Sequence, residues 1–202
     1  PGQFRENQGR LAGTDNPYGD FLQSVEQVSL LETDQGLLLV LHASNPQGVE
    51  EALRPLQGEG SDFQGTMVYP LAGNNLLREA FTPLLDRWPQ PSYYGVIEDA
   101  FVFAPDYEGL QSLISAHNRK ATYATTPRFG KLQPLLATES SSLLISENPG
   151  SSRILTDSLA LTVLPEDFIE RLPEGYLATA QMNLEDDFPL RTFQFRDTVR
   201  SA

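Results

Sequence analysis

Apolar and polar residues follow one another in short runs along this chain, and the runs predict antiparallel hairpins followed by short helices. The first hairpin joins residues 25–32 to residues 37–43 through a polar turn. Gly36 closes this turn, where a residue that tolerates positive φ permits a tight connection. Apolar residues at helical spacing then predict a short helix at 47–53, which stops before Pro55 because proline disfavours helix at the residue before it.

A second unit of the same kind follows later in the chain. Residues 93–97 and 100–104 are two further apolar runs joined by a short acidic turn. We expect a helix after them, with Pro105 at its start and Asn118 at its C-cap. The strand, strand, helix order thus occurs twice, which indicates either a weak internal duplication or the ordinary arrangement of an α+β chain.

The remaining pattern predicts short elements separated by Gly- and Pro-rich turns. These are a helix at 17–27, a loop at 57–65, a strand at 66–71, a helix at 76–88 that Pro83 interrupts, a helix from Pro127, strands at 141–146 and 153–163, a helical turn at 166–172, and a hairpin of 176–184 with 190–196. Together they predict an α+β fold of antiparallel β-hairpins with short helices packed on one side.

Composition along the chain predicts three regions. Residues 1–16 are polar and Gly-rich without a hydrophobic period, so we expect a flexible N-terminal tail. The run Asn-Pro-Gly-Ser-Ser at 148–152 is the clearest loop signal in the chain. We therefore expect an α+β domain over 17–147 and a C-terminal β-rich subdomain over 148–202 packed on it.

The overall composition is that of a chain that folds around its own core, because 40% of its 202 residues are hydrophobic. The chain has no cysteine, which excludes disulfides, thiolate catalysis and cysteine-bound zinc within it. Its longest apolar runs contain about five residues, whereas a membrane-spanning helix needs about twenty. We therefore expect no transmembrane segment.

The chain is acidic, with 27 acidic residues against 14 basic ones and a net charge of −13. Such a charge repels phosphate backbones and anionic lipid headgroups, so we expect no nucleic-acid partner. Residues 117–131, here called the basic segment, are the local exception: they hold Arg119, Lys120, Arg128 and Lys131 together with Tyr123 and no acid.

The basic segment is the candidate partner-binding site of the chain. Its charges suit an acidic protein partner, the acidic surface of another copy, a polyanion, or other domains of a larger parent chain. The alternative is a structural role, in which the four bases neutralise acidic groups nearby in the fold.

Catalytic and metal-binding patterns give little support to an enzyme. The two histidines, His42 and His117, have no second histidine or carboxylate at a ligand spacing, and no Gly-x-Ser-x-Gly elbow occurs. The Gly-rich stretch at 58–65 lacks the lysine of a phosphate-binding loop and favours a turn. The acids at 166–167 and 185–187 are consecutive, as in solvated turns and unlike calcium loops. We therefore predict no catalytic residue, cofactor or metal.

Residues 93–145 carry a resemblance to a known family. The strand pair YYGVIEDAFVFA, the helical LQSLI, the helix start TPRFGKL and the strand SSLLIS resemble a family of uncharacterised exported bacterial proteins, a domain of unknown function found in envelope proteins and lipoproteins. The sequence departs from the family where Ala104 and Pro105 replace an expected Ser or Thr helix cap. The resemblance implies an exported module, periplasmic or lipid-anchored at the cell envelope, and it brings no catalytic residue.

The sequence therefore favours a noncatalytic binding or scaffolding module of a bacterial cell-envelope protein. A hydrolase is one alternative, and it requires either paired carboxylates or a pocket where a Ser or Glu meets His42 or His117. A domain that binds a small molecule or a polysaccharide is another, and it requires aromatic residues such as Trp88, Tyr93 and Tyr94 to line one groove.

Overall fold

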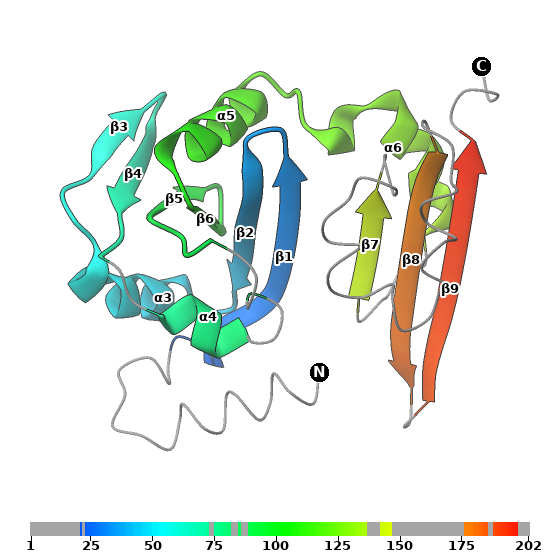
Figure 1. Ribbon diagram of the computed structural model, residues 1–202, viewed down its shortest axis with the longest axis horizontal. Coiled ribbons are helices and arrows are strands. Elements are labelled where there is room, and N and C mark those ends of the chain that lie inside the picture. The colour runs from blue at the N-terminus through cyan, green and yellow to red at the C-terminus, as the bar shows by residue number, and fades with distance from the viewer. Residues whose placement is uncertain are drawn as a thin grey trace. The chain divides into compact units, whose positions relative to one another are not determined.

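The chain forms two compact units, Pro1–Arg119 and Lys120–Ala202, in the computed structural model (Figure 1). The structure describes residues 21, 23–72, 75–81, 85, 89–136, 142–146, 176–185 and 188–197. In the strands of the second unit, side chains are described at Leu143, Ile145, Ser146 and Thr179. Each unit is treated by itself below.

A six-stranded antiparallel sheet organises the first unit, in the order β1-β2-β6-β5-β4-β3 (Figure 1). Its strands are β1 (Val25–Thr33), β2 (Gly36–Ala43), β3 (Ser61–Phe63), β4 (Thr66–Pro70), β5 (Tyr93–Ile97) and β6 (Ala100–Ala104). The predicted hairpins β1–β2 and β5–β6 are confirmed. Gly36 has a φ of 120°, as its place in the first turn requires.

The helices of the first unit are α3 (Pro46–Leu53), η1 (Arg54–Leu56), α4 (Leu76–Phe81) and α5 (Tyr107–Asn118). Asn45 caps α3, with its Oδ1 accepting from the Gly48 N–H at 3.3 Å. Asp106 caps α5 in the same way, accepting from the Gly109 N–H at 2.8 Å. This corrects the expectation that α5 starts at Pro105. Asp106 provides the side-chain acceptor that Pro105 lacks, so the helix begins after it.

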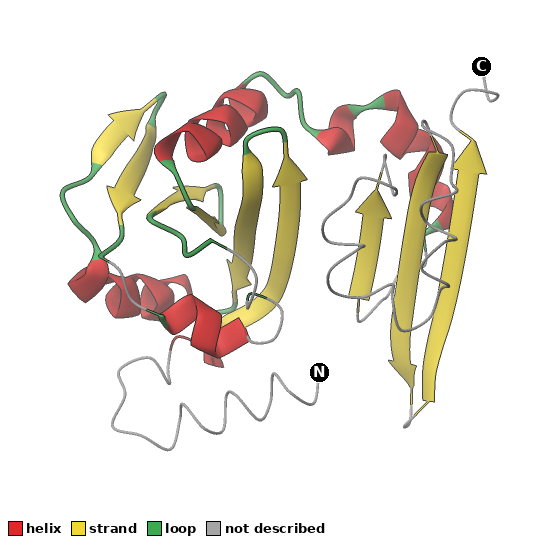
Figure 2. Cartoon of the chain, in the orientation of Figure 1, coloured by secondary structure: helices red, strands yellow, loops and turns green. Residues whose placement is uncertain are grey.

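Two apolar clusters lie on opposite faces of the six-stranded sheet, because alternate residues of a strand point to opposite faces and both sets are apolar in β6. Phe101 and Phe103 belong to the first core, and Val102 and Ala104 belong to the second. Residues of α3 and α4 complete the first core, namely Val49, Ala52, Leu53, Leu76, Leu77, Ala80 and Phe81. Leu110 and Ile114 of α5 complete the second. Figure 2 shows the helices and strands in separate colours.

The α+β class is confirmed, but the helices cover both faces of the sheet and not the one side expected. The reason is that β6 is buried along its whole length, so a helix layer is needed on each face. The strand, strand, helix order does occur twice. A rotation relating the antiparallel neighbours β2 and β6 would keep both helices on one face, whereas α3 and α5 lie on opposite faces. The two strand-strand-helix segments therefore share an order of elements, but their helices cover opposite faces of the sheet.

The predicted loop at 57–65 contains a strand that the sequence pattern missed. Residues Ser61–Phe63 form β3 and pair with β4 through a turn in which Gln64 and Gly65 have positive φ. The strand is too short to show a hydrophobic period. An ideal Cβ at Gly60 would lie 2.5 Å from the Tyr69 ring, so this glycine reflects close packing.

A three-stranded antiparallel sheet in the order β7-β8-β9 forms the second unit, from β7 (Ser142–Ser146), β8 (Tyr176–Glu185) and β9 (Phe188–Asp197). The helical segments before it are η2 (Tyr123–Thr125), α6 (Pro127–Leu132) and η3 (Gln133–Leu135). The chain divides after Arg119, whereas the sequence predicts a boundary near residue 148. β7 lies before that loop but pairs with β8, so it belongs to the C-terminal unit.

Several expectations lie wholly or partly outside the described residues. They are the tail at 1–16, residues 17–20 and 22 of the helix at 17–27, most of the helix after Phe81, the strand at 153–163 and the turn at 166–172. Within the first helical stretch, Phe21 is fully buried in the first core, whereas Val25 already starts β1.

Candidate functional site

One of the two histidines contacts a carboxylate, and that contact lies at an exposed position outside the described cavity. His117 on α5 places its Nε2 3.5 Å from Oε1 of Glu98, and the two side chains are 36% and 75% exposed. His42 on β2 is half-buried and stands opposite Gln27 and Ala100 in the sheet. No group of three His, Asp or Glu side chains that could hold a metal occurs in the described part of the chain.

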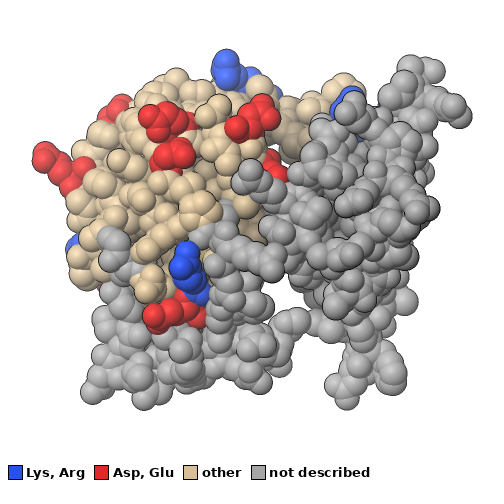
Figure 3. Space-filling model, in the orientation of Figure 1, with Lys and Arg blue, Asp and Glu red and all other residues tan. Residues whose placement is uncertain are grey.

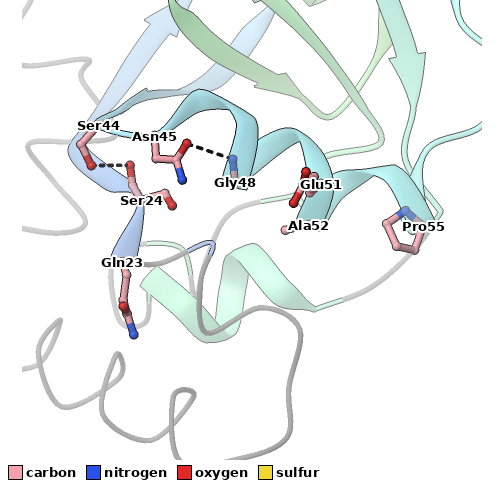
Figure 4. A pocket seen from close by; sticks show the side chains of 8 residues that line it. All are labelled: Gln23, Ser24, Ser44, Asn45, Gly48, Glu51, Ala52 and Pro55. Carbon is pink, nitrogen blue, oxygen red and sulfur yellow. Dashed lines mark hydrogen bonds between the residues drawn. The ribbon is translucent and has the colours of Figure 1, made fainter.

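A polar cavity of about 560 Å³ lies where β1 and β2 meet the start of α3 (Figure 4). Its described lining residues are Gln23, Ser24, Ser44, Asn45, Gly48, Glu51, Ala52 and Pro55. The Ser44 hydroxyl donates to the Ser24 carbonyl at 3.2 Å, and Asn45 caps α3. These polar groups hold the helix on the hairpin, and no histidine is among them.

The glycine at position 48 explains why this junction is tight. An ideal Cβ there would lie 2.9 Å from both Asn45 Nδ2 and Ser24 Oγ. The signal for the junction was present in the sequence as Asn45 followed by Pro46, a cap and a first helical residue. That Ser24, the residue before β1, would take part in it follows only from the tertiary structure.

The aromatic residues expected to line a groove do not do so in the described structure. Tyr93 and Tyr94 are consecutive in β5 and therefore point to opposite faces of the sheet. Tyr94 is 3% exposed in the first core, whereas Tyr93 packs beside the second. Trp88 lies outside the described residues.

Tyr94 is a buried tyrosine whose surroundings shift its ionisation. Its ring stacks between Tyr69 and Phe103, with centroid distances of 5.2 and 5.7 Å, and its hydroxyl donates to Oε1 of Gln57. Burial, with smaller effects of Tyr69 and Glu50, raises the pKa of Tyr94 from 10.0 to about 12. A phenol held neutral in this way fits a structural role in the core.

A second aromatic group lies on the other face of the sheet. Tyr107 contacts Tyr93 and Phe63, with centroid distances of 5.6 and 6.5 Å, and its hydroxyl lies 3.3 Å from the Ser61 Oγ. All three rings are half-buried. They join the β3–β4 hairpin to the start of α5 and face one another more than solvent.

The Gly-rich stretch at 58–65 contains β3 and the turn to β4, so the predicted turn is found at Gln64 and Gly65. Asp62 Oδ1 accepts from the Gly65 N–H at 3.4 Å, and Gln64 Nε2 donates to the Ser115 hydroxyl at 3.2 Å. The Asn118 amide also donates to the Gln64 carbonyl at 3.3 Å. These bonds tie the hairpin tip to α5 and leave no phosphate cradle.

The basic segment crosses the division between the two units. Arg119 is the last residue of the first unit, and its Nε donates to the Ser115 carbonyl at 3.1 Å at the end of α5. Lys120 opens the second unit with a φ of 53°. Both side chains are exposed. They are neighbours in sequence, but the first stabilises a helix end and the second starts a new structural unit.

The rest of the basic segment forms a short capped structure within the second unit. Thr126 Oγ1 accepts from the Phe129 N–H at 3.2 Å and so caps α6, as the Thr-Pro helix start predicted. The rings of Tyr123 and Phe129 meet edge to face at 5.7 Å. Arg128 and Lys131 are three residues apart on α6, which places them on one side of the helix, and both are exposed.

The acidic residues at 185–187 are described only in part. Glu185 is the last residue of β8, and Asp186 and Asp187 lie outside the described residues, as do Glu166 and Asp167.

Comparisons with known proteins add no assignment, since no family model, curated protein or solved structure matches this chain. The resemblance of residues 93–145 to an exported envelope family stays a prediction. None of the described helices is long and apolar enough to cross a membrane.

Proposed function

We propose that this chain is a noncatalytic binding module of a bacterial cell-envelope protein and that the basic segment contacts an acidic partner protein. The observation that carries the proposal is the exposure of Arg119, Lys120, Arg128 and Lys131 in a chain of net charge −13. No acidic residue occurs between Glu108 and Glu139, so the local charge of this stretch is strongly positive. Opposite charge on a partner would steer association and orient the complex.

The surface of the first unit differs in charge from the basic segment. Several acidic side chains lie on the face of this unit shown in Figure 3, where acidic groups are red. An acidic background weakens general attraction to polyanions, which favours a partner protein that presents a limited acidic patch. Arg128 and Lys131, one turn apart on α6, are the residues best placed to recognise such a patch.

The binding experiment uses a fluorescently labelled polyglutamate peptide as the acidic probe and measures anisotropy at low and physiological salt. We expect the substitutions Arg128→Glu and Lys131→Glu each to weaken binding by about fivefold at low salt, because one charge pair near a protein surface contributes roughly 1 kcal/mol. Arg54→Glu is the matched control, an exposed arginine in η1 of the first unit with the same change in charge.

Two results would count against this function. Equal weakening by Arg54→Glu and Arg128→Glu would show that only the net charge matters. Tighter binding of duplex DNA than of polyglutamate at the same salt concentration would indicate a nucleic-acid partner in place of an acidic protein.

The hydrolase alternative is tested separately with a fluorophosphonate probe, which labels serines activated by a neighbouring base. The cavity beside Ser24 and Ser44 has no histidine among its described lining residues, so we expect no labelling there. Stoichiometric labelling that a single Ser→Ala substitution abolishes would establish a catalytic serine.

The envelope location rests on the resemblance of residues 93–145. Fractionation of cells that produce the full-length protein tests it, and recovery with the cytosolic fraction would remove this part of the proposal.

A further inference from the structure

The strand β1 forms one edge of the six-stranded sheet. It is nine residues long and pairs with β2 from Val25 opposite Ala43 to Thr33 opposite Gly36. No described strand pairs with its other side. In an antiparallel ladder, alternate residues of an edge strand direct their N–H and C=O groups away from the sheet. Backbone groups along β1 are therefore available to a further strand.

Two uncharged side chains of β1 are exposed to solvent. Gln27 is exposed, and Leu31 is 36% exposed although it is a large apolar residue. Proteins usually protect edge strands with charged side chains, proline or a bulge. β1 has no proline or lysine, its two charged residues are Glu26 and Glu32 towards its ends, and its one irregularity lies between Val25 and Gln27. From Gln27 to Thr33 the strand is regular and suited to pairing.

The charges at this edge point to the kind of strand that fits it. Glu26 and Glu32 are exposed towards the two ends of β1, and Asp34 is exposed in the turn that follows. Glu26 lies at the irregularity between Val25 and Gln27, so a second copy of β1 paired antiparallel about Ser29 would bring Glu26 near Glu32 without placing them directly opposite. This approach of like charges at both ends of the pair is unfavourable. A strand that carries lysine or arginine at these positions would instead form pairs of opposite charge.

We propose that β1 is a strand-addition site that binds an extended basic segment of a partner protein. Main-chain hydrogen bonds along the edge supply affinity, and the acids at its ends supply the preference for basic peptides. The opposite edge, β3, has three residues and offers too short a template for the same role. The site is separate from the basic segment and prefers the opposite charge.

The test uses the full chain and a fluorescently labelled peptide of alternating lysine and valine with nine residues, the length of β1. We expect binding that shifts the amide resonances of β1 in NMR spectra and that the matching glutamate-valine peptide does not reproduce. Leu31→Lys should weaken binding by about tenfold or more, because a lysine on the edge repels the peptide and protects the strand. Met67→Lys is the matched control.

Met67 suits this purpose because it is also an exposed apolar strand residue, 42% exposed on β4, but its strand is paired on both sides. We expect its substitution to change the affinity by less than about twofold. Circular dichroism of both variants establishes that they fold, and the NMR shifts of the unsubstituted chain locate the site if either variant fails.

Three outcomes would overturn the proposal. The lysine-valine peptide could fail to bind, its shifts could fall outside β1, or the acidic peptide could bind equally well. A dimer seen by sedimentation velocity that Leu31→Lys dissociates would assign the edge to a second copy and would also overturn it. None of these results bears on the polyglutamate experiment, which probes residues of α6.

Discussion

Tyr94 brings a polar group into the first core, and its surroundings determine how this core responds to alkaline pH. The ring is buried between Tyr69 and Phe103, and the hydroxyl is satisfied by Gln57. Because ionisation would place a charge in the core, burial raises the pKa of Tyr94 to about 12. The unfolded chain ionises first as pH rises, so the native state becomes less favourable.

The pH dependence of stability follows from this shift. Below pH 10.0, the ordinary pKa of a tyrosine side chain, the phenol is neutral in both states and the stability is complete. Between that pH and the folded pKa of about 12, we expect the free energy of unfolding to fall by up to roughly 1.4 kcal/mol per pH unit from this group. Urea unfolding across this range measures the slope, and Tyr94→Phe should reduce it.

The control for this prediction is Tyr107→Phe, which removes a half-buried phenol on the other face of the sheet. Equal slopes in the two variants would contradict the assignment to Tyr94. At neutral pH, Tyr94→Phe leaves Gln57 without its donor, so we expect a loss of about 1 kcal/mol in the free energy of unfolding.

At the scale of elements, N-terminal capping residues determine where the helices of this chain begin. Pro105 and Asp106 connect β6 to α5, and the Asp106 side chain accepts a hydrogen bond from the Gly109 N–H. The cap stabilises the first turns of α5, which place Leu110 and Ile114 in the second core. A start at Pro105 would leave the first turn without this acceptor.

The substitution Asp106→Ala tests the importance of the cap. We expect the free energy of unfolding to fall by about 1 kcal/mol, because an alanine cannot accept the bond from the first turn. Asp106→Asn keeps an acceptor and should cost less than half as much. Chemical unfolding monitored by helical circular dichroism measures both variants, and equal losses would show that the charge of Asp106 matters and its hydrogen bond does not.

At the scale of the whole molecule, the chain consists of two units with separate sheets. All residues of the first and second cores precede Arg119, whereas β7 pairs only with β8 among the described strands. Residues 148–152 belong to the second unit and stand between β7 and β8 in the sequence.

Truncation distinguishes the two boundaries. We expect a chain ending at Arg119 to retain the six-stranded sheet, because it contains both cores. A chain ending at residue 147 should show rapid amide exchange at Ser142–Ser146, since β7 has lost its partner β8. Hydrogen exchange with mass spectrometry measures both. Persistent protection of these residues in the longer fragment would place β7 with the first unit.

Local pattern was sufficient for most elements of the fold. The hairpins β1–β2, β5–β6 and β8–β9 and the helices α3, α5 and α6 agree with the predicted ranges within about two residues, because turn glycines, caps and prolines act on neighbouring residues. The hairpin β3–β4 does not follow from the pattern. Among the candidate site residues, the bases of the basic segment stand out by composition alone. The opposite directions of Tyr93 and Tyr94 follow from the strand period, so the alternative in which both line one groove conflicts with the strand predicted at 93–97.

What the sequence by itself determined is the α+β class, the hairpin order and the concentration of positive charge at residues 117–131. The tertiary structure decided which face each helix covers, that β1 lies at an edge, and that the division of the chain falls within the basic segment. These features depend on contacts between residues far apart in the chain. Propensity and periodicity report only on neighbours, whereas strand order and domain division are set by which apolar surfaces bury one another.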